Sequence, residues 1–344
     1  MCKTQCRGVQ RYTREILHAI DELPESRNVK VIIPHKHIYK DSFKNIRIVE
    51  FGGYLTAKLW QYFGYQLYIW LKRPFSICLS DGNPLFNNGA ITIHDVRYLV
   101  DSKKEASLRI KAYLIFQIIA TRRAIQRSKE IFTISEFSKS EISRIYHIDE
   151  NRIKVCYCSW EQLNDIEADE RIFEKHTQVK EGNYYFMLGG SEESKNMRWI
   201  FEMAKKYPNR QFVMAGPGNM YFPSENVDFS ECKNFHHLGY ITDGEMKALM
   251  KHCIAFLFPS KYEGFGIPPM EAISCGAKAI VSNATCLPEI YGQYVSYFSP
   301  EDYDADLDKL VAITPDNQKD LLNHYSWKKT AEQIMHIAKQ YIKE

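Results

Sequence analysis

FLFPSKYEGFGIPPME, residues 256–271, holds a strand, a loop and the start of a helix in close succession. The apolar run at its beginning predicts a buried strand over 256–258. Pro268 and Pro269 fit the first turn of a helix, where a missing N–H costs no internal hydrogen bond, and Gly276 fits the end of that helix. A strand, a glycine-containing loop and a helix in this order are typical of a parallel α/β sheet.

The loop between this strand and this helix is suited to bind an anion. Ligands of open parallel sheets bind beyond the carboxyl ends of the strands, where this loop lies. The positive end of the helix dipole attracts a diphosphate, and Gly264 and Gly266 let it approach the backbone. Glu263 and Glu271 flank the pocket and could hold hydroxyls of a sugar and a ribose. The alternative is that Glu271 only complements the dipole and Glu263 is a surface turn residue.

Short apolar runs alternate with helix-length stretches along the chain, which predicts parallel sheets with helices on both faces. A chain of 344 residues fits two domains of ordinary size. The polar stretch 161–182 marks the break between them, and the apolar spacing from Trp327 to about Lys343 predicts a closing helix. We expect one domain over 1–160, joined by the helix at about 327–344, and a second over 161–326. The strand-like runs are VKVIIP (29–34), SICLSD (76–81), ITIHD (91–95), IFTIS (131–135), IKVCYC (153–158), YYFMLGG (184–190), FVMAGPG (212–218), FHHLGYI (235–241), AFLFPS (255–260), KAIVSN (278–283) and VSYFS (295–299).

Composition is that of a globular protein, with 45% apolar and 25% charged residues. We see neither an apolar stretch long enough to span a membrane nor the apolar region of a signal peptide, so we expect a cytoplasmic protein. The nine cysteines form no CxxC pair. Cys156 and Cys158 would share one face of a strand, which favours core packing over the alternative of a metal site, and we predict no zinc.

Charge is distributed unevenly: residues 1–160 hold 26 Lys and Arg against 15 Asp and Glu, although the whole chain is only +3. A basic half predicts an anionic partner, which could be nucleic acid, a lipid diphosphate or a membrane surface. The alternative is a solvated basic face. No nucleic-acid-binding motif accompanies the charge, so we expect no nucleic-acid partner.

An aromatic-rich stretch, YLTAKLWQYFGYQLYIWLKRPF (54–75), ends in Lys72 and Arg73. Aromatic and apolar side chains beside basic ones suit a membrane interface or a lipid-linked acceptor. Core packing is the alternative. We expect peripheral contact with an anionic membrane through the basic half, on the inner face of the plasma membrane.

The segment 263–290, EGFGIPPMEAISCGAKAIVSNATCLPEI, resembles the signature of the retaining glycosyltransferases of family 4, in particular their mannosyltransferase-like members in surface polysaccharide synthesis. Six further segments, given at the end of this paragraph, resemble the same family. The resemblance is strongest over 184–300 and 326–333, and leaves about 40–88 and the interdomain stretch unmatched. It implies the GT-B fold: two facing Rossmann-like, doubly wound domains with a cleft between them. The other segments are RGVQRYTREIL (7–17), ITIHDVRYL (91–99), IFTISEFSKSEISRIY (131–146), LGGSEESKN (188–196), LGYITDGEMKALM (238–250) and SWKKTAEQI (326–334).

The resemblance also implies roles for individual residues. Glu263 would hold the hydroxyls of the transferred sugar, Lys195 would contact the diphosphate, and His94 would touch the sugar near the reacting carbon, although a histidine at a strand end is often structural. Glu271 would hold the ribose. The remaining donor-binding residues are Gly8, the backbone around Gly216 and Tyr240 near the base, and the backbone of Gly264, Phe265, Gly266 and Ile267 on the diphosphate.

One cation of the family pattern is absent here. The family often has an arginine five residues before the lysine, and Gly190 occupies that position. Either the helix dipole compensates for it, or another residue such as Arg198 replaces it.

Two neighbouring motifs leave alternatives open. Ser135 and Glu136 lie at a cleft-facing strand end and could contact acceptor or phosphate, or could belong to a helix start capped by Ser138. We expect Asp95 to hold its loop.

DYDADLD (302–308) repeats the Asp-x-Asp pattern that metal-dependent glycosyltransferases of a different fold use. It precedes a predicted helix, so we expect an acidic helix start and no required metal or other cofactor.

The beginning of the chain departs from the doubly wound pattern. Such domains open with a central strand, yet MCKTQCR (1–7) before Gly8 does not resemble one. We therefore expect the first strand of the first domain to be missing, so that either the natural chain starts upstream of Met1 or this domain is less stable.

The resemblance implies a retaining glycosyltransferase that moves a hexose from a nucleotide-diphosphate sugar, with GDP-mannose favoured. We expect a lipid-linked or saccharide acceptor in cell-surface polysaccharide synthesis. The alternative is a non-catalytic relative that binds a nucleotide sugar or a partner protein, which Gly190 and the missing strand would favour.

Overall fold

The structure is a computed structural model that describes residues 8–35, 41–53, 60–80, 89–100, 108–190 and 192–342. The chain divides into two compact units. Unit 1 comprises Met1–Cys158 and Trp327–Glu344, and unit 2 comprises Ser159–Ser326.

Unit 2 is built around a six-stranded sheet in the order β11-β8-β7-β12-β13-β14, and all its pairs are parallel. The chain moves outward from β7 to one edge, returns, and moves from β12 to the other edge. This is the doubly wound order of a Rossmann-like domain, with its reversal between β7 and β12. The strands are β7 (Tyr184–Leu188), β8 (Gln211–Ala215), β11 (Phe235–His237), β12 (Ala255–Phe258), β13 (Ala279–Ser282) and β14 (Ser296–Phe298).

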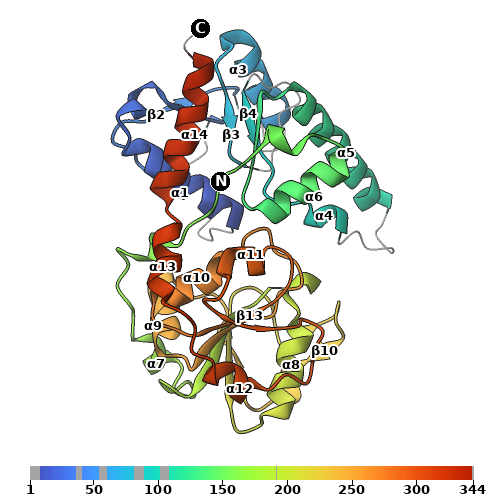
Figure 1. The fold of residues 1–344 in the computed structure, drawn as a ribbon, viewed down its shortest axis with the longest axis vertical. Coiled ribbons are helices and arrows are strands. Elements are labelled where there is room, and N and C mark those ends of the chain that lie inside the picture. The colour runs from blue at the N-terminus through green and yellow to red at the C-terminus, as the bar shows by residue number, and fades with distance from the viewer. Residues whose placement is uncertain are drawn as a thin grey trace. The chain divides into compact units, whose positions relative to one another are not determined.

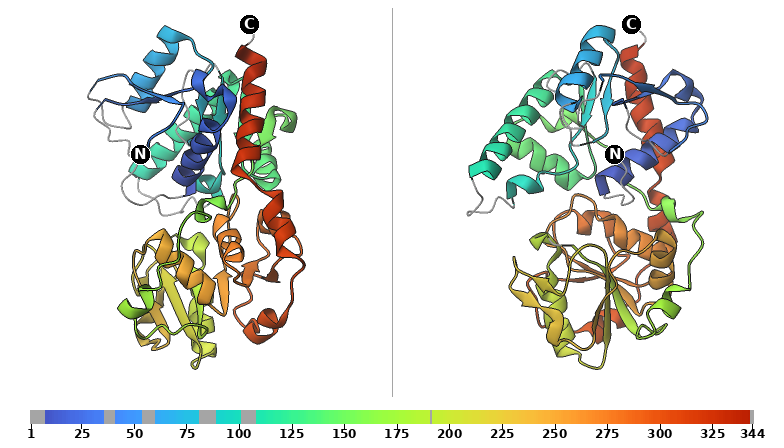
Figure 2. Two further views of the ribbon diagram at one scale, coloured as in Figure 1. Left: turned by 90° about the vertical axis from the view of Figure 1, so that its left-hand side faces the viewer. Right: turned by 180° about the vertical axis from the view of Figure 1, so that it is seen from behind.

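Helices cover both faces of this sheet (Figure 2). Because both faces are covered, β12 and β13 are buried along their whole length and consist of apolar and small residues. The helices of unit 2 are α7 (Ile172–Lys175), α8 (Met197–Lys206), α9 (Asp243–His252), α10 (Ile267–Ser274), α11 (Leu287–Tyr291), α12 (Leu307–Ala312) and α13 (Gln318–His324), and a short hairpin joins β9 (Tyr221–Phe222) to β10 (Val227–Asp228).

The polar stretch between the domains is packed against unit 2. Lys247 of α9 donates from Nζ to the carbonyl oxygens of Leu163 and Ile166, each at 2.7 Å. Further along, Lys175 pairs with the carboxylate of Glu245. The stretch therefore forms short helical turns held by α9, because its charged side chains and carbonyls find partners on that helix.

Unit 1 contains a four-stranded parallel sheet in the order β3-β4-β5-β6 and a separate parallel pair, β1-β2. The pair includes β2, a strand that we did not predict. Our expectation of a missing first strand concerns residues 1–7, which lie outside the described residues. The elements are β1 (Lys30–Ile33), β2 (Arg47–Glu50), β3 (Ile77–Cys78), β4 (Ala90–Thr92), β5 (Glu130–Thr133), β6 (Ile153–Val155), α1 (Gly8–Asp21), α3 (Tyr65–Lys72), α4 (Arg97–Val100), α5 (Leu108–Arg127), α6 (Glu136–Tyr146) and α14 (Trp327–Ile342).

The closing helix α14 lies along α1, so the two ends of the chain pack in one unit (Figure 1). The predicted closing helix is confirmed as α14, and its apolar residues Ala331, Ile334 and Ala338 are buried. Tyr341 is only half-buried, but its ring stacks on that of Phe75 with centroids 5.2 Å apart. A helix distant in sequence from the rest of unit 1 thus contributes to the core of that unit.

Cys156 and Cys158 are both buried, reduced thiols of unit 1. Burial raises the pKa of Cys156 to about 12 and that of Cys158 well above its usual value. Both thiols therefore stay protonated near neutral pH and pack as small apolar groups.

Among the described residues, no helix combines the length and the apolar character that crossing a bilayer requires.

Candidate functional site

The candidate site of unit 2 lies where the strand order reverses. At such a point the loops after two neighbouring strands diverge to opposite faces of the sheet and leave a crevice for a ligand. Lys195 follows β7, and Glu263 follows β12, the neighbouring strand. The fold therefore brings together two predicted site residues that are 68 positions apart in the sequence.

Lys195 and Glu263 form an ion pair. Lys195 Nζ donates to Glu263 Oε1 at 2.7 Å, and the ammonium also lies over the ring of Phe258, 5.4 Å from its centroid. The two side chains are 24% and 14% exposed, so both charges are largely removed from water. Each is compensated by the other, and a cation and a hydrogen-bond acceptor are held at one point of the crevice.

The backbone of Glu263 is held by the loop that follows β13. Its N–H donates to Thr285 Oγ1 at 3.1 Å, and Cys286 Sγ donates to its carbonyl oxygen at 3.2 Å. Thr285 adopts a left-handed conformation with φ of 51°, which is uncommon for a β-branched residue. Strain of this kind persists where neighbouring contacts fix the backbone, and here those contacts hold Glu263.

Asn196 joins three loops at the same edge of the sheet. Its Nδ2 donates to the carbonyl oxygens of Pro259 and Pro300 at 3.0 and 2.8 Å, in the loops after β12 and β14. Asn196 has a φ of 55°, and asparagine tolerates this region better than most residues. The position of Lys195 is thereby tied to the loop that carries Glu263.

The N-terminus of α10 is shaped for a ligand by its loop. Gly266 has a φ of 83°, and a Cβ there would lie 2.7 Å from Leu287 Cδ2, so glycine is required. Pro268 and Pro269 lack an N–H, and the N–H of Met270 donates to the hydroxyl of Tyr291 at 3.1 Å. Backbone donors for an anion at this helix end must therefore come from the residues up to Ile267.

Tyr291 fixes this helix end from α11. Its buried hydroxyl donates to the carbonyl oxygen of Gly266 while it accepts from Met270 N. Burial raises the pKa of Tyr291 well above its usual value, so the hydroxyl keeps its proton. Phe265 is 2% exposed and its ring packs edge-on against Tyr325, so the phenyl ring belongs to the core.

Glu271 lies further along α10 and is 3% exposed. Its Oε1 accepts a hydrogen bond from Gln162 Nε2 at 2.5 Å. Burial of a charge demands hydrogen-bonding partners, and Gln162 supplies one of them.

Gly216 and Tyr240 follow β8 and β11, two strands that neighbour each other. Gly216 has a φ of 109°, and a Cβ there would approach Gly189 O at 3.0 Å. Its carbonyl oxygen lies 3.0 Å from His237 Nε2. Tyr240 is 59% exposed, so its ring is accessible at the edge where a base is expected.

In unit 1, His94 is buried directly beyond β4. The ring of Tyr12 meets it edge-on with centroids 5.0 Å apart, and Tyr12 comes from α1, the helix that Gly8 begins. Asp95 holds its loop as expected, since its Oδ1 accepts from Arg97 N at 3.0 Å.

The capping prediction at α6 named the wrong serine. Ser135 is the cap, and its Oγ accepts from the N–H of Ser138 at 3.0 Å. Ser135 has extended backbone angles and Ser138 is already helical, which is why the earlier residue serves as the cap. Glu136 pairs with Lys139 at 3.1 Å on the surface of the helix.

The side chain of Arg198 lies over the ring of Tyr303. Its guanidinium lies 5.2 Å from the centroid of the Tyr303 ring, and the backbone N–H of Arg198 donates to Glu225 Oε2 at 3.0 Å. A Cβ at Gly190 would lie 3.3 Å from Lys195 Cγ, so an arginine at 190 would start beside the lysine.

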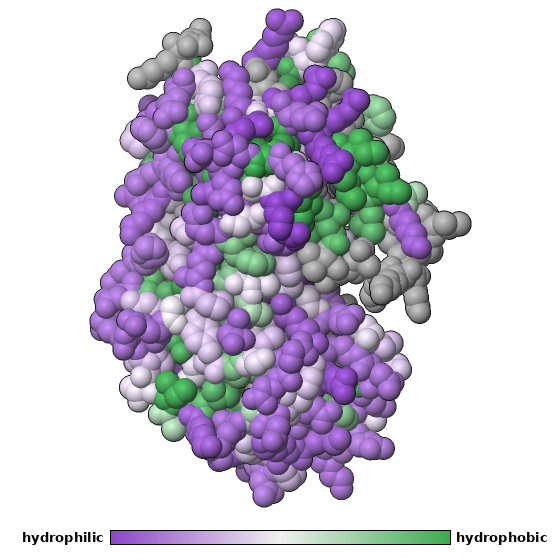
Figure 3. All heavy atoms as spheres, turned by 45° about the vertical axis from the view of Figure 1, so that its right-hand side comes forward, coloured by the Kyte–Doolittle hydropathy of each residue, from purple (hydrophilic) through white to green (hydrophobic). Residues whose placement is uncertain are grey.

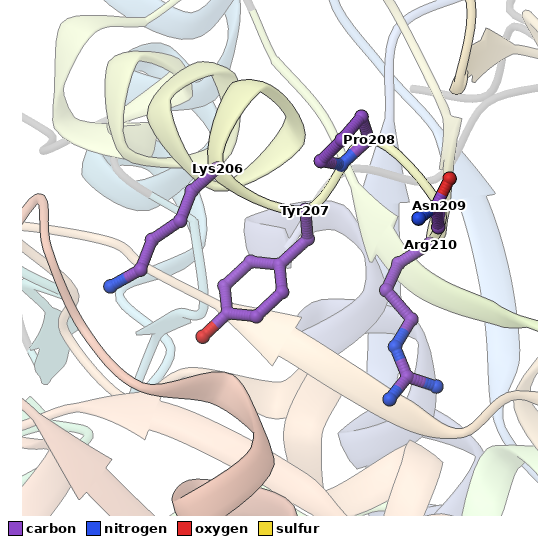
Figure 4. A pocket seen from close by; sticks show the side chains of 5 residues that line it. All are labelled: Lys206, Tyr207, Pro208, Asn209 and Arg210. Atoms are coloured by element: carbon purple, nitrogen blue, oxygen red, sulfur yellow. The ribbon is translucent and has the colours of Figure 1, made fainter.

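The acidic stretch 302–308 forms ion pairs with basic residues of α8 and the turn after it. Lys206 pairs with Asp304 at 2.6 Å, and Arg210 with Asp308 at 3.0 Å, while Asp306 caps α12. Lys206 and Arg210 belong to the wall of a shallow pocket of about 430 Å³ (Figure 4). Within the described ranges, no group of three or more His, Cys, Asp or Glu side chains is arranged to hold a metal ion.

Several residues that shape the site were not predicted, namely Thr285, Cys286, Tyr291, Asn196 and Gln162. Thr285 and Cys286 lie within the segment that carries the family resemblance, but nothing local shows that they hold Glu263. Their contacts join loops of different strands and become visible only in the fold.

Comparison with known proteins shows which families this chain is similar to. Residues 168–328 match the family described as "Glycosyl transferases group 1". The chain is 26% identical over 259 residues to the O-antigen chain mannosyltransferase RfbU of Salmonella typhimurium, an alignment that covers 72% of this chain and 68% of RfbU. It is 27% identical over 231 residues to O-antigen chain mannosyltransferase B of Escherichia coli. That alignment covers 62% of this chain and 58% of the relative, so it spans less than two thirds of the relative's length.

Solved structures share the fold. HepE of Anabaena, solved in complex with UDP-glucose, has a TM-score of 0.69 at 14% identity and covers 99% of this chain and 98% of its own. WaaG, a glycosyltransferase of lipopolysaccharide biosynthesis, has a TM-score of 0.61 at 15% identity, covering 98% and 93%. Together with the Rossmann-like sheet of unit 2, these similarities establish the predicted GT-B fold class.

Proposed function

We propose that this chain, whose residues 168–328 match the family "Glycosyl transferases group 1", is a retaining glycosyltransferase that transfers mannose from GDP-mannose. The proposed acceptor is a lipid-linked or saccharide intermediate of surface polysaccharide synthesis. The donor proposal is supported by the two similar proteins that are named as O-antigen mannosyltransferases.

The observation that carries the proposal is the Lys195–Glu263 pair at the switch point of the sheet of unit 2. In the proposed reaction, Lys195 and the backbone up to Ile267 stabilise the negative charge that grows on the departing diphosphate. Glu263 accepts hydrogen bonds from hydroxyls of the sugar, and Glu271 accepts them from the ribose. Gly216 and Tyr240 border the base, while His94 and Gly8 act from unit 1.

Glycosyl transfer then breaks the bond between the anomeric carbon and the diphosphate oxygen. The acceptor hydroxyl attacks from the face that the diphosphate leaves, and its proton passes to a diphosphate oxygen. The positive charge that develops at the sugar is stabilised by the nearby diphosphate, so the reaction as proposed requires no metal and no further cofactor.

The test is transfer and donor hydrolysis with a panel of GDP- and UDP-sugars. We expect turnover with GDP-mannose, and a fall of roughly 100- to 1,000-fold in Lys195→Ala, because one electrostatic contact to the transition state is lost. Lys261→Ala is the matched control, since Lys261 lies in the loop after β12 and pairs with Glu301. Equal turnover in wild type, Lys195→Ala and Glu263→Ala would contradict the proposed site.

We also propose that unit 1 binds the surface of an anionic membrane, where a lipid-linked acceptor would be found. Ile115, Phe116 and Ile119 of α5 are 43–58% exposed. Lys111 and Arg122 are exposed too and share a face with Ile115 and Ile119, because these positions recur at helical spacing. Figure 3 shows hydrophobic side chains gathered at the surface on the right-hand side of the view.

The aromatic-rich stretch adds a second exposed group, although its residues 54–59 lie outside the described part of the chain. Phe63, Leu67, Trp70 and Leu71 are 47–70% exposed. Core packing therefore does not explain these four side chains, which suit a membrane interface as Lys72 and Arg73 do.

Flotation with vesicles tests the membrane proposal. We expect binding to vesicles that contain phosphatidylglycerol and weaker binding to pure phosphatidylcholine. Ile115→Ser combined with Ile119→Ser should abolish flotation, whereas Ile313→Ser, at an exposed apolar residue of unit 2, should not. Failure of the wild-type protein to float with anionic vesicles would refute the proposal.

A further inference from the structure

The contact between Gln162 and Glu271 joins two segments 109 positions apart. Glu271 is buried, and Gln162 donates to its Oε1 through a neutral amide. An amide donor orients a carboxylate without neutralising it, whereas a lysine or arginine would form an ion pair. The bond from Gln162 therefore fixes the position of one carboxylate oxygen of Glu271.

The residues on either side of Gln162 are held by hydrogen bonds to other parts of unit 2. Gln162 belongs to the short helical turn Glu161–Leu163, and Trp160, just before it, donates from Nε1 to Leu322 O at 3.0 Å. After it, Leu163 O accepts from Lys247 Nζ at 2.7 Å. These two hydrogen bonds restrain the helical turn that carries Gln162, and they thereby help to hold its amide against Glu271.

We propose that Gln162 is a positioning residue for recognition of the donor ribose. Its amide fixes the orientation of Glu271, so that the carboxylate is ready to accept from ribose hydroxyls before the nucleotide arrives. A site that is organised in advance loses less conformational entropy on binding. This inference rests on the proposed function, in which Glu271 binds the ribose.

The experiment compares nucleotides that differ in one ribose hydroxyl. GDP and UDP, with their 2′-deoxy and 3′-deoxy forms, are titrated into wild type and Gln162→Ala by calorimetry. Wild type should bind a ribonucleotide more tightly than at least one deoxy form. In Gln162→Ala the affinity for that ribonucleotide should fall roughly tenfold, the cost of a misplaced hydrogen bond to a charged group, while the affinity for that deoxy form changes less than about twofold.

Two further variants control for folding. Gln162→Met keeps the length of the side chain without its donor and should behave as Gln162→Ala does. Asn164→Ala, at an exposed position directly after the same turn, should bind like wild type.

The outcomes are distinct. Equal weakening of ribo and deoxy forms in Gln162→Ala and Gln162→Met would overturn the inference, because it would show general damage. Tighter ribonucleotide binding would overturn it as well, since Gln162 would then compete with the ribose. If wild type bound none of these nucleotides, the proposed function would fail, and the inference with it.

Discussion

Lys195 Nζ and Glu263 Oε1 lie 2.7 Å apart, and this contact joins the loops after β7 and β12, the two strands between which the sheet order reverses. The pair is mostly shielded from water, so each charge depends on the other for compensation. A donor diphosphate that binds here must share Lys195 with Glu263.

The pair should show strong energetic coupling. Lys195→Met leaves a shielded carboxylate without its cation and should lower the free energy of unfolding by about 1–3 kcal/mol. Adding Glu263→Gln should recover much of this loss, because both charges are then gone. Urea denaturation of the two single variants and the double variant measures the coupling, and strictly additive losses would show that the pair contributes no interaction energy.

Tyr291→Phe should loosen the N-terminus of α10. It removes the hydroxyl between Gly266 O and Met270 N and leaves two buried backbone groups without that partner. We expect a loss of about 1–3 kcal/mol in the free energy of unfolding and a higher KM for the donor. Tyr297→Phe removes a longer bond of 3.3 Å to Leu287 O and serves as the control. Equal effects of the two substitutions would contradict the proposed role of Tyr291.

An arginine at position 190 should strengthen nucleotide binding. The new side chain starts 3.3 Å from Lys195 Cγ, and the Glu192 carboxylate, 2.5 Å from the added Cβ, must move aside. We expect Gly190→Arg to bind a nucleoside diphosphate up to about tenfold more tightly, with a steeper dependence on salt. Gly190→Gln adds a long side chain without the charge. Titrations at low and high salt compare the two variants. Equal affinity of Gly190→Arg and Gly190→Gln for the nucleoside diphosphate would show that the added positive charge does not strengthen binding.

His236 should make the protein less stable in mild acid. Burial lowers the pKa of its imidazole below 6.5, so the folded state favours the neutral ring. Below pH 6.5 the unfolded chain therefore binds more protons than the folded one. The free energy of unfolding decreases as the pH is lowered, until the pH is below the pKa of His236 in the folded state. His236→Gln should reduce the difference in unfolding midpoint between pH 7.5 and 5.0. His336→Gln, at an exposed position on α14, is the control, and an unchanged difference in His236→Gln would refute the assignment.

Metal removal should leave the transfer rate unchanged. Asp304 and Asp308 are engaged by Lys206 and Arg210 on the surface, and Asp306 caps a helix. EDTA, and Asp304→Asn combined with Asp308→Asn, should each change transfer by less than about twofold, because exposed ion pairs contribute little. A loss of activity with EDTA that Mg²⁺ or Mn²⁺ restores would contradict this prediction.

Much of the fold was accessible from the sequence because buried parallel strands read as short apolar runs. Each of the strand-like runs overlaps an observed strand, and β4, β5 and β8 begin one residue before their runs. Three observed strands in the described part of the chain were not predicted. The sequence of β2 is RIVE, with a charged residue at each end, and β9 and β10 have two residues each. These elements expose part of their surface or are too short to show a period.

The candidate site was accessible only in part. Glu263, Glu271 and Gly266 belong to one continuous segment whose loop and helix are encoded locally. The contact of Glu271 with Gln162 could not be predicted, because the polar stretch around Gln162 carries no periodicity. Its course depends on the carbonyl oxygens that accept from Lys247 and on the bond from Trp160.

By itself the sequence determined the alternation of strands and helices, the glycine loop that opens α10 and the residue types available for a nucleotide sugar. These follow from periodicity and backbone preference over a few neighbouring residues. Only the tertiary structure decided that Lys195 meets Glu263, that Tyr291 ties Gly266 to Met270, and that Gln162 orients Glu271. Such contacts depend on which strands become neighbours in the sheet, and that order is set by the burial of all strands together.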